Sequence, residues 1–435
     1  MTPFALRLTL LTLAGFLLRT LWLPSQPVSF DDYMVGITAI NYMESGQLGP
    51  TMWNHPVLRN IIVYGAMKLF GSGVVGIKGW NVLFGSLSTP LLALVTRRLL
   101  QSERVALTAA FLWAVEPLAI DFSRQAINDI YLAFFPLLGI WLVLRYLDDY
   151  RPVWLLLAGV AWGCGLASKW SALFPLVVTG CYLLWQSRRA SAENAGGAAP
   201  RLLYYAATLV VLPCTLYLLT FLPWFGRGYA LTEWPDLQRS MYLETKLHTG
   251  YHEAIVGDHL AWEWFVKPVT FRDLYFNAGY GPAGGAMTLL LAVADPLVWL
   301  LVLPAVGMLL YRGWREHSTG HLTVVLLFLV SYLPLVVARR PIWLNTALSV
   351  LPFAQMAVAW LVWQIGSREQ LKKRLAGAWL AAVLVISAIL YLPVIGKGEL
   401  LPVIGPSLME RFADEPRYEK TPYLPAPQQT EGTER

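Results

Sequence analysis

Charged residues are scarce in this chain of 435 residues. Asp, Glu, Lys and Arg together make up 14% of it, whereas an average soluble domain carries about 25%. Apolar residues reach 56%, and the mean hydropathy is +0.51. So few charges cannot cover the surface of a soluble protein of this length. The composition therefore excludes a soluble globular or disordered protein and predicts a protein that crosses the membrane several times.

Cysteine frameworks, nucleotide motifs and internal repeats are also absent from the sequence. The three cysteines, Cys164, Cys181 and Cys214, lie inside apolar segments, so the chain has neither a disulfide framework nor a cysteine metal spacing. It has no Gly-rich nucleotide motif and no H-E-x-x-H frame. The net charge of +6 comes from basic residues scattered between apolar runs, which indicates loop charges and no nucleic-acid partner.

Long apolar runs follow one another along the chain. A bilayer core of about 30 Å needs roughly 20 such residues per helix, and on this basis we predict an all-α polytopic protein with about eleven transmembrane helices. The first run is interpreted as a retained helix, because no small-residue cleavage signature follows it. The spans are predicted near 4–23, 76–96, 105–120, 130–147, 152–167, 170–187, 202–222, 286–311, 322–338, 342–365 and 375–394.

Clusters of basic residues predict the orientation of these spans. Such clusters follow spans two, six, eight and ten, so all of them lie on one side if the spans alternate regularly. Short basic loops stay in the cytoplasm, which places the N-terminus inside and the C-terminus outside. The cluster residues are Arg97, Arg98, Arg104, Arg188, Arg189, Arg201, Arg312, Arg315, Arg368, Lys372, Lys373 and Arg374. The segments predicted outside are 24–75, 121–129, the turn around Lys169, 223–285, the Arg339–Arg340 pair and the tail from 395.

Three cations do not fit the charge rule. Lys169, Arg339 and Arg340 lie at the predicted outer ends of spans, where a charge costs several kcal/mol unless it is paired or hydrated. They either extend to the outer headgroups or form a pocket for an anionic lipid headgroup. Beside a polyprenyl phosphate, such cations would bind the donor and stabilise the departing phosphate.

Carboxylates accumulate on the same predicted side. Asp31 and Asp32 follow the outer end of the first span, and Asp129 opens the fourth. An acidic pair at a membrane edge can cap a helix. Carboxylates together with cations and histidines, however, suit a reaction between an anionic donor and a hydroxyl that must lose its proton.

The predicted outer loops also contain histidine and tryptophan. His248, His252 and His259 could ligate a metal but follow no known ligand spacing, so a divalent metal stays open. With Trp262 and Trp264 in the same loop, a substrate-facing surface is favoured. The segment WNHPVLRN and its continuation predict an amphipathic helix on the outer surface.

Several segments in order resemble one known family. FDDYMVG at 30–36 resembles its F-D-E motif, with Asp32 in place of the Glu, and NHPVLRN at 54–60 resembles its H-P-P-L-G-K segment. SRQAINDIYLAFF at 123–135 resembles its S-R-x-x-x-x-D segment, and GLASKWSALFPLV at 165–177 is similar to its G-L-A-x-x-x-K-W stretch.

The resemblance continues through the second half of the chain. The stretch from Tyr251 and His252 to Pro268 is similar to a Y-H…H…W-x-W-P pattern. ADPLVWL at 294–300 resembles N-P-x-x-W, and 338–353 resembles R-x-x-F…P-F. Together these segments resemble the GT-C membrane glycosyltransferases, and within them the polyprenyl-phosphate-mannose protein O-mannosyltransferases.

The resemblance implies a GT-C transmembrane catalytic domain over 1–395. The tail over 396–435 is expected outside the membrane and partly disordered, because it is rich in Pro, Glu and Gln from about Pro406. Outer loops 24–75 and 223–285 would form the active-site face. The implied activity moves a sugar, mannose in the nearest relatives, from a polyprenyl-phosphate donor to a protein Ser/Thr hydroxyl with inversion. The expected location is a prokaryotic inner or plasma membrane, with the active site on its periplasmic or extracellular side.

Roles for individual residues follow from the same resemblance. Asp31 is expected to be the general base, and Asp32 to position the acceptor or share the charge. The expected ligands of the donor phosphate are Lys169, Arg124, Arg340 and Arg339. The expected substrate-positioning residues are Asp129, His55, His259, Trp262 and Trp264.

Departures from the family pattern leave the acceptor open. Asn345, Thr346 and Ala347 stand where the family has Tyr-His-Tyr, and the chain has no room for the β-trefoil domain of eukaryotic relatives. An aminoarabinose-transferase-like enzyme that modifies lipid A or another lipid or glycan is the nearest alternative. A transporter of lipid-linked sugars is disfavoured, because transporters place charges at mid-membrane and often contain repeats. A non-catalytic subunit should lack the first-loop carboxylates.

Overall fold

The computed structural model describes residues 2–26, 28–49, 55–191, 198–251, 260–266, 275–280, 288–338, 342 and 344–397. Within these ranges it describes the backbone alone at 28–31, 190–191, 198, 244–251, 275–280 and 288–291. The predicted tail over 396–435 therefore lies outside the described residues, apart from its first two.

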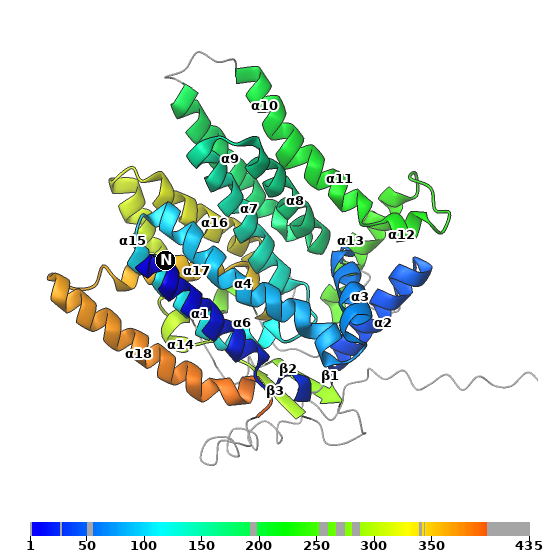
Figure 1. The fold of residues 1–435 in the computed structure, drawn as a ribbon, viewed down its shortest axis with the longest axis horizontal. Helices are drawn as coiled ribbons and strands as arrows, with labels where there is room; N and C mark the ends of the chain where they lie inside the picture. Colours follow the sequence, from blue (N-terminus) through cyan, green and yellow to red (C-terminus); the bar gives the residue numbers. More distant parts are fainter. Residues whose placement is uncertain are drawn as a thin grey trace, which may run out of the picture.

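Long apolar helices dominate the described chain (Figure 1). By length and composition seven segments can cross a membrane, or eight if a bent helix pair forms one span. These segments are formed by α1 (Pro3–Thr20), α4 (Val74–Leu100), the bent pair α5 (Glu103–Val115) and α6 (Pro117–Ser123), α7 (Asp129–Asp149), α10 (Ala198–Ala206) with α11 (Leu212–Leu219), α14 (Pro296–Trp299) with α15 (Val302–Arg315), α16 (Thr319–Val336) and α18 (Glu369–Val394). The other apolar helices are α8 (Pro152–Ser168), α9 (Leu173–Ser191) and α17 (Leu351–Val362).

All eleven predicted spans contain helix, which confirms a helical, multi-pass membrane protein. The count of eleven complete crossings is not reached by the length criterion in the described residues. One boundary was wrong: the span predicted over 286–311 begins with a strand, and its helices start only at Pro296. The span predicted over 105–120 bends by 58° between α5 and α6. This bend falls at Glu116, because a residue that precedes proline is disfavoured in helical geometry.

Helix α4 lies at the centre of the bundle and contacts α1, α5 and α7 along much of its length. The largest buried apolar cluster extends from α4 through α5, α7 and α8 to α15, α16 and α17. Fully buried Trp113, Trp162 and Trp299 contribute its largest side chains. A core of this kind positions the ends of the helices, where the polar residues lie.

A small antiparallel sheet, which the sequence did not predict, lies at one end of the bundle (Figure 1). Its strands are β1 (Val28–Ser29), β2 (Tyr275–Tyr280) and β3 (Thr288–Ala292), paired in the order β1-β2-β3. Val28 lies opposite Tyr280, and Ser29 lies opposite Gly279. The sheet thus joins the segment before α2 (Phe30–Ser45) to a segment some 250 residues later in the chain.

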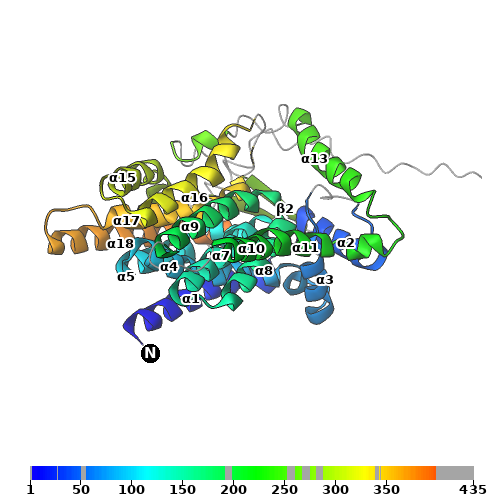
Figure 2. The same cartoon turned by 90° about the horizontal axis from the view of Figure 1, so that it is seen from above.

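Shorter helices gather at this end of the molecule. They are α2, α3 (Leu58–Phe70), α12 (Leu222–Phe225) and α13 (Trp234–Tyr251), and α13 stands apart from the long helices in Figure 2. Tyr42, Phe221 and Met241 form a buried cluster between these segments, and the Tyr42 hydroxyl donates to the Thr220 carbonyl at 2.5 Å. The surface helix predicted from residue 53 begins at Leu58.

The predicted basic clusters meet at the other end. An ion pair joins Arg98 to Asp148 at 2.9 Å, and another joins Arg104 to Glu369. One cavity there is lined by residues from α4, α7, α9 and the α15–α16 turn. We call this the basic end, formed by residues 97–104, 145–151, 186–189, 312–321 and 368–374.

Candidate active site

The first carboxylate of the candidate site is that of Asp32, in the first turn of α2. The side chain is 1% exposed, and its Oδ2 lies 2.7 Å from Nζ of the fully buried Lys78 on α4. Its Oδ1 accepts a hydrogen bond from the Ala126 backbone N–H at 2.7 Å. Both carboxylate oxygens are therefore engaged, and the start of α2 is fixed against α4 and against the loop before α7.

One side chain of α4 holds that loop. Asn81 lies one helical turn after Lys78, and its amide donates to the carbonyls of Gln125 at 2.6 Å and Ile127 at 2.9 Å. Its own oxygen accepts from the Tyr131 hydroxyl at 2.7 Å. The same face of α4 thus places the loop, and through it the position of Asp129 at the start of α7.

The second carboxylate is that of Asp129. Its Oδ1 lies 2.7 Å from Lys169 Nζ, and its Oδ2 accepts from the Asn345 amide at 2.9 Å. Lys169 ends α8 in an extended conformation, and Asn345 lies in the short 3-10 segment Leu344–Ser349. Three distant parts of the chain therefore meet at one carboxylate.

Two ion pairs, one fully buried and one partly exposed, consequently share one end of the bundle. We call this the site end, formed by Asp32, Lys78, Asp129, Lys169 and Asn345. Desolvated charges are costly, and they persist where a partner and further hydrogen bonds compensate for the lost water. Among its four charged side chains Lys169 is the most accessible, with 17% of its side chain exposed. Of the two lysines it is therefore the one better placed to meet a ligand.

Arg124 lies in the same loop and is fully buried. Its Nη1 donates to the carbonyls of Arg19 and Leu21 at 2.8 Å each, so it completes the C-terminal end of α1, as basic side chains often do. Its Nε and Nη2 have no hydrogen-bond partner among the described residues. Burial lowers the pKa of Arg124 to about 10, an effect that Tyr391 and Asp121 oppose, and the guanidinium stays charged at neutral pH.

The remaining predicted residues divide into two groups. Trp264 is buried and packs on Tyr332 with a ring separation of 6.5 Å, Trp262 is mainly exposed, and His55 is half-buried before α3. The backbone of Asp31 lies in the first turn of α2. Its side chain, together with His259, Arg339 and Arg340, lies outside the described residues.

Sequence reasoning missed Lys78 and Asn81 and treated Asn345 only as a departure from a motif. The available signal was a lysine and an asparagine near the start of an apolar span, three residues apart on one helical face. In the part of the chain that the structure describes, no group of three His, Cys, Asp or Glu side chains could hold a metal ion.

Comparisons with known proteins agree with this architecture. One chain of the S. cerevisiae protein O-mannosyltransferase Pmt1-Pmt2 complex bound to the sugar donor superposes with a TM-score of 0.76 at 13% identity. The match covers 92% of this chain and 91% of that one. A family model, described as dolichyl-phosphate-mannose-protein mannosyltransferase, matches residues 8–227.

Sequence comparison finds similarity to two kinds of glycosyltransferase, represented by one relative each. The polyprenol-phosphate-mannose–protein mannosyltransferase of Corynebacterium glutamicum is 21% identical in an alignment that covers 65% of this chain and 65% of that one. The undecaprenyl phosphate-alpha-4-amino-4-deoxy-L-arabinose arabinosyl transferase 1 of Pseudomonas fluorescens is 24% identical over 78% of this chain and 54% of that one. The matches span just under two thirds and about half of these relatives' own lengths.

The fold and its polar end define a multi-pass membrane protein of the GT-C glycosyltransferase architecture. Since the family model covers half of the chain, the protein belongs to the dolichyl-phosphate-mannose-protein mannosyltransferase family.

Proposed function

We propose that this protein is an inverting glycosyltransferase that moves mannose from a polyprenyl-phosphate donor to a Ser/Thr hydroxyl of a protein. The observation that supports this most directly is the two ion pairs, Asp32–Lys78 and Asp129–Lys169, which lie on either side of the loop before α7. The first pair holds the first turn of α2, where the backbone of the adjacent Asp31 lies. Family membership supplies the class of donor.

In the proposed reaction the acceptor oxygen attacks the anomeric carbon of the sugar from the face opposite the phosphate. The new bond joins that oxygen to the anomeric carbon. The bond between the anomeric carbon and the phosphate oxygen breaks, and its electron pair leaves with the polyprenyl phosphate. The hydroxyl proton passes to a carboxylate acting as general base.

We assign that base to Asp31 because Asp32 is unsuited to the task. Asp32 is almost fully buried, and Lys78 and the Ala126 N–H already engage both of its oxygens. A carboxylate held in this way cannot approach an acceptor hydroxyl. Its proposed contribution is to fix the first turn of α2, and with it the backbone of the neighbouring base.

The departing phosphate needs positive charge near it. We propose Lys169 for this role, because it is partly exposed and Asp129 orients its ammonium group. Arg124 is the second candidate, since two of its guanidinium nitrogens have no hydrogen-bond partner in the described part of the chain. Arg339 and Arg340 stay proposals from the sequence. A preorganised cation of this kind lowers the barrier by stabilising charge that develops in the transition state.

We place the reaction at the outer face of the membrane. The site end is opposite the basic end, and basic loops favour the cytoplasm. The partners would be the bilayer, a lipid-linked sugar and a hydroxyl acceptor. The relative from Pseudomonas fluorescens supports a second candidate, the transfer of aminoarabinose. For this candidate we propose lipid A or another lipid or glycan as the acceptor.

A transfer assay separates these proposals. The full-length protein in detergent would receive radiolabelled polyprenyl-phosphate-mannose or radiolabelled polyprenyl-phosphate-aminoarabinose, each together with a Ser/Thr-rich peptide or with lipid A. Mannose label on the peptide supports protein mannosylation. Label on lipid A alone, from either donor, supports the second candidate, and failure to consume either donor with either acceptor contradicts both proposals.

A further inference from the structure

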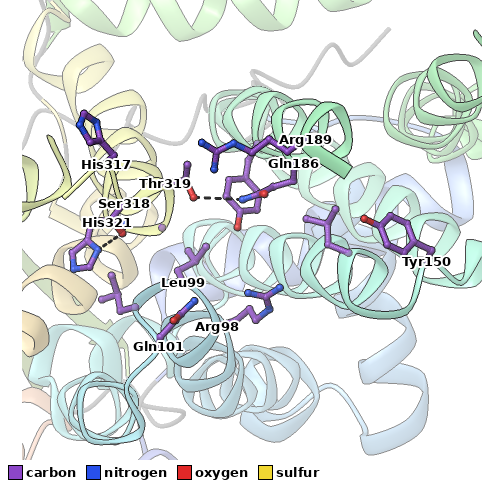
Figure 3. A pocket seen from close by; sticks show the side chains of 14 residues that line it. Arg98, Leu99, Gln101, Tyr150, Gln186, Arg189, His317, Ser318, Thr319 and His321 are labelled. Atoms are coloured by element: carbon purple, nitrogen blue, oxygen red, sulfur yellow. Dashed lines mark hydrogen bonds between the residues drawn. The ribbon is translucent and has the colours of Figure 1, made fainter. Parts of the chain in front are cut away.

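The basic end contains a cavity of about 720 Å³ that the proposed sugar transfer does not use. It lies where the C-terminal ends of α4 and α7, the last turns of α9 and the N-terminal end of α16 meet (Figure 3). Four segments that are distant in the sequence thus enclose one space at the level where the membrane helices end.

The charged side chains that line this cavity in the described part of the chain have one sign. They are Arg98 and Arg189, and His317 and His321 line the cavity beside them. No Asp or Glu of the described residues lines it. Arg98 donates through its Nε to Oδ1 of Asp148 at 2.9 Å, and Asp148 lies outside the lining. The space is therefore suited to an anion.

Polar groups accompany these charges. Figure 3 shows Gln186 reaching Thr319 across the cavity, and its amide donates to the Thr319 hydroxyl at 3.4 Å. Ser318 caps α16 and lies 2.5 Å from Nδ1 of His321. Hydroxyl groups, arginine and the positive end of a helix dipole are the groups that bind phosphate in proteins.

The backbone that presents these side chains is unusual. Gln101, Tyr150 and His317 adopt a left-handed conformation with φ of 50°, 54° and 50°. All three lie where α4, α7 and α15 end and line the cavity, whereas only one other non-glycine in the described chain has a positive φ. Glycine is the residue usually found at such helix ends. Three non-glycine residues in this costly conformation indicate that their side chains have a function in the cavity.

The walls of the cavity are also held closely together. At Gly320, in the first turn of α16, a Cβ atom would lie 2.0 Å from the Leu99 carbonyl oxygen of α4. The two backbones touch at this point, so the cationic groups on α4 stay next to the N-terminal end of α16. Such preorganisation reduces the entropy lost when a ligand binds.

We propose that this cavity binds the phosphate of an anionic phospholipid headgroup. The location favours a lipid, because the cavity lies where the long apolar helices end and basic loops begin. This site is separate from the proposed sugar-transfer site, which lies at the opposite end of the bundle. Free phosphate has the same chemistry and forms a separate arm of the test.

The test measures binding to the full-length, delipidated protein in a neutral detergent. Short-chain phosphatidylglycerol, phosphatidylcholine with the same chains, and inorganic phosphate would each be titrated and followed by the shift in melting temperature. Phosphatidylglycerol should bind wild type and should bind Arg189→Gln at least about tenfold more weakly, the loss expected for one charge-assisted hydrogen bond. Arg188→Gln is the matched control, since Arg188 is adjacent and exposed but does not line the cavity. It should bind within about twofold of wild type, the change expected for an exposed charge.

A glycine variant separates binding from folding. His317→Gly should melt at or above the wild-type temperature without lipid, because glycine suits its left-handed conformation, and yet bind the lipid more weakly. Binding of inorganic phosphate that depends on Arg189 and is not displaced by phosphatidylglycerol would support an anion site in this cavity. It would overturn the assignment to a lipid headgroup and show that the ligand is free phosphate. Equal losses in the Arg188 and Arg189 variants, or equal binding of phosphatidylcholine, would overturn the proposal.

Discussion

The ion pairs at the two ends of the bundle differ in their exposure to water. At the site end the partners Asp32 and Lys78 are at most 1% exposed. At the basic end the side chains of pairs such as Arg97–Glu103 and Arg312–Glu316 are about half exposed, between 46% and 54%. Both ends belong to the same helices, and the difference lies in whether water reaches the charges.

This difference in exposure indicates at which end each charge depends on one particular partner. Exposed pairs contribute between about 0 and 1 kcal/mol each, so the basic end can exchange partners with little effect on folding. A buried pair is retained only where its geometry is exact, because removal of one partner leaves an uncompensated charge. The polar groups of the site end are therefore expected to hold fixed positions, which the proposed reaction requires.

The largest effect on stability is expected from Lys78→Met. This change leaves the buried Asp32 carboxylate without its cation and should lower the free energy of unfolding by about 3–5 kcal/mol. Thermal unfolding in detergent would measure it. The double variant with Asp32→Leu removes both charges and should recover most of the stability. An unchanged melting temperature in the single variant would contradict the buried pair.

Lys169→Met should have a smaller effect on folding. Because Lys169 is partly exposed, water can approach Asp129 after the change, and the expected loss is about 2–3 kcal/mol, as for a hydrogen bond to a charged group. The rate of sugar transfer at sub-saturating donor should also fall, by a larger factor than the loss of folded protein explains. A variant that transfers sugar at the wild-type rate would remove Lys169 from the proposed phosphate site.

Asn345→Leu tests the third contact of the site end. It removes the amide that donates to Asp129 Oδ2 but leaves the ion pair to Lys169, so the expected loss of stability is about 1 kcal/mol. Asn345→Asp is the informative companion, because it places a second carboxylate beside the first and should cost more. Equal melting temperatures of the two variants would contradict the hydrogen bond between Asn345 and Asp129.

The smallest effect is expected at the basic end. Arg312→Gln breaks an exposed pair at i,i+4 spacing, and such pairs contribute about 0.3–0.5 kcal/mol. Chemical denaturation at low and at high salt would measure the change, which should shrink further at high salt. A loss as large as that of Lys78→Met would abolish the contrast between the two ends.

The sequence predicted the membrane class, the helical segments and several polar residues of the site end. It named Asp32, Asp129 and Lys169, but it gave Asp129 and Lys169 separate roles, because pairing between residues on different helices leaves no local pattern. It also missed β3, since a short apolar strand next to an apolar helix has no distinguishing period. Arg124 was expected at the donor phosphate, and a sequence gives no sign that a guanidinium also completes the end of α1.

The most direct test of the proposed mechanism is the rate of sugar transfer by Asp31→Asn beside wild type. We predict a fall of about 10²–10⁴-fold in single-turnover transfer, the range for loss of a general base. The melting temperature and donor binding should stay unchanged, because the Asp32–Lys78 pair is intact. Transfer near the wild-type rate in a folded variant would contradict the assignment of Asp31 as the base and the site built around it.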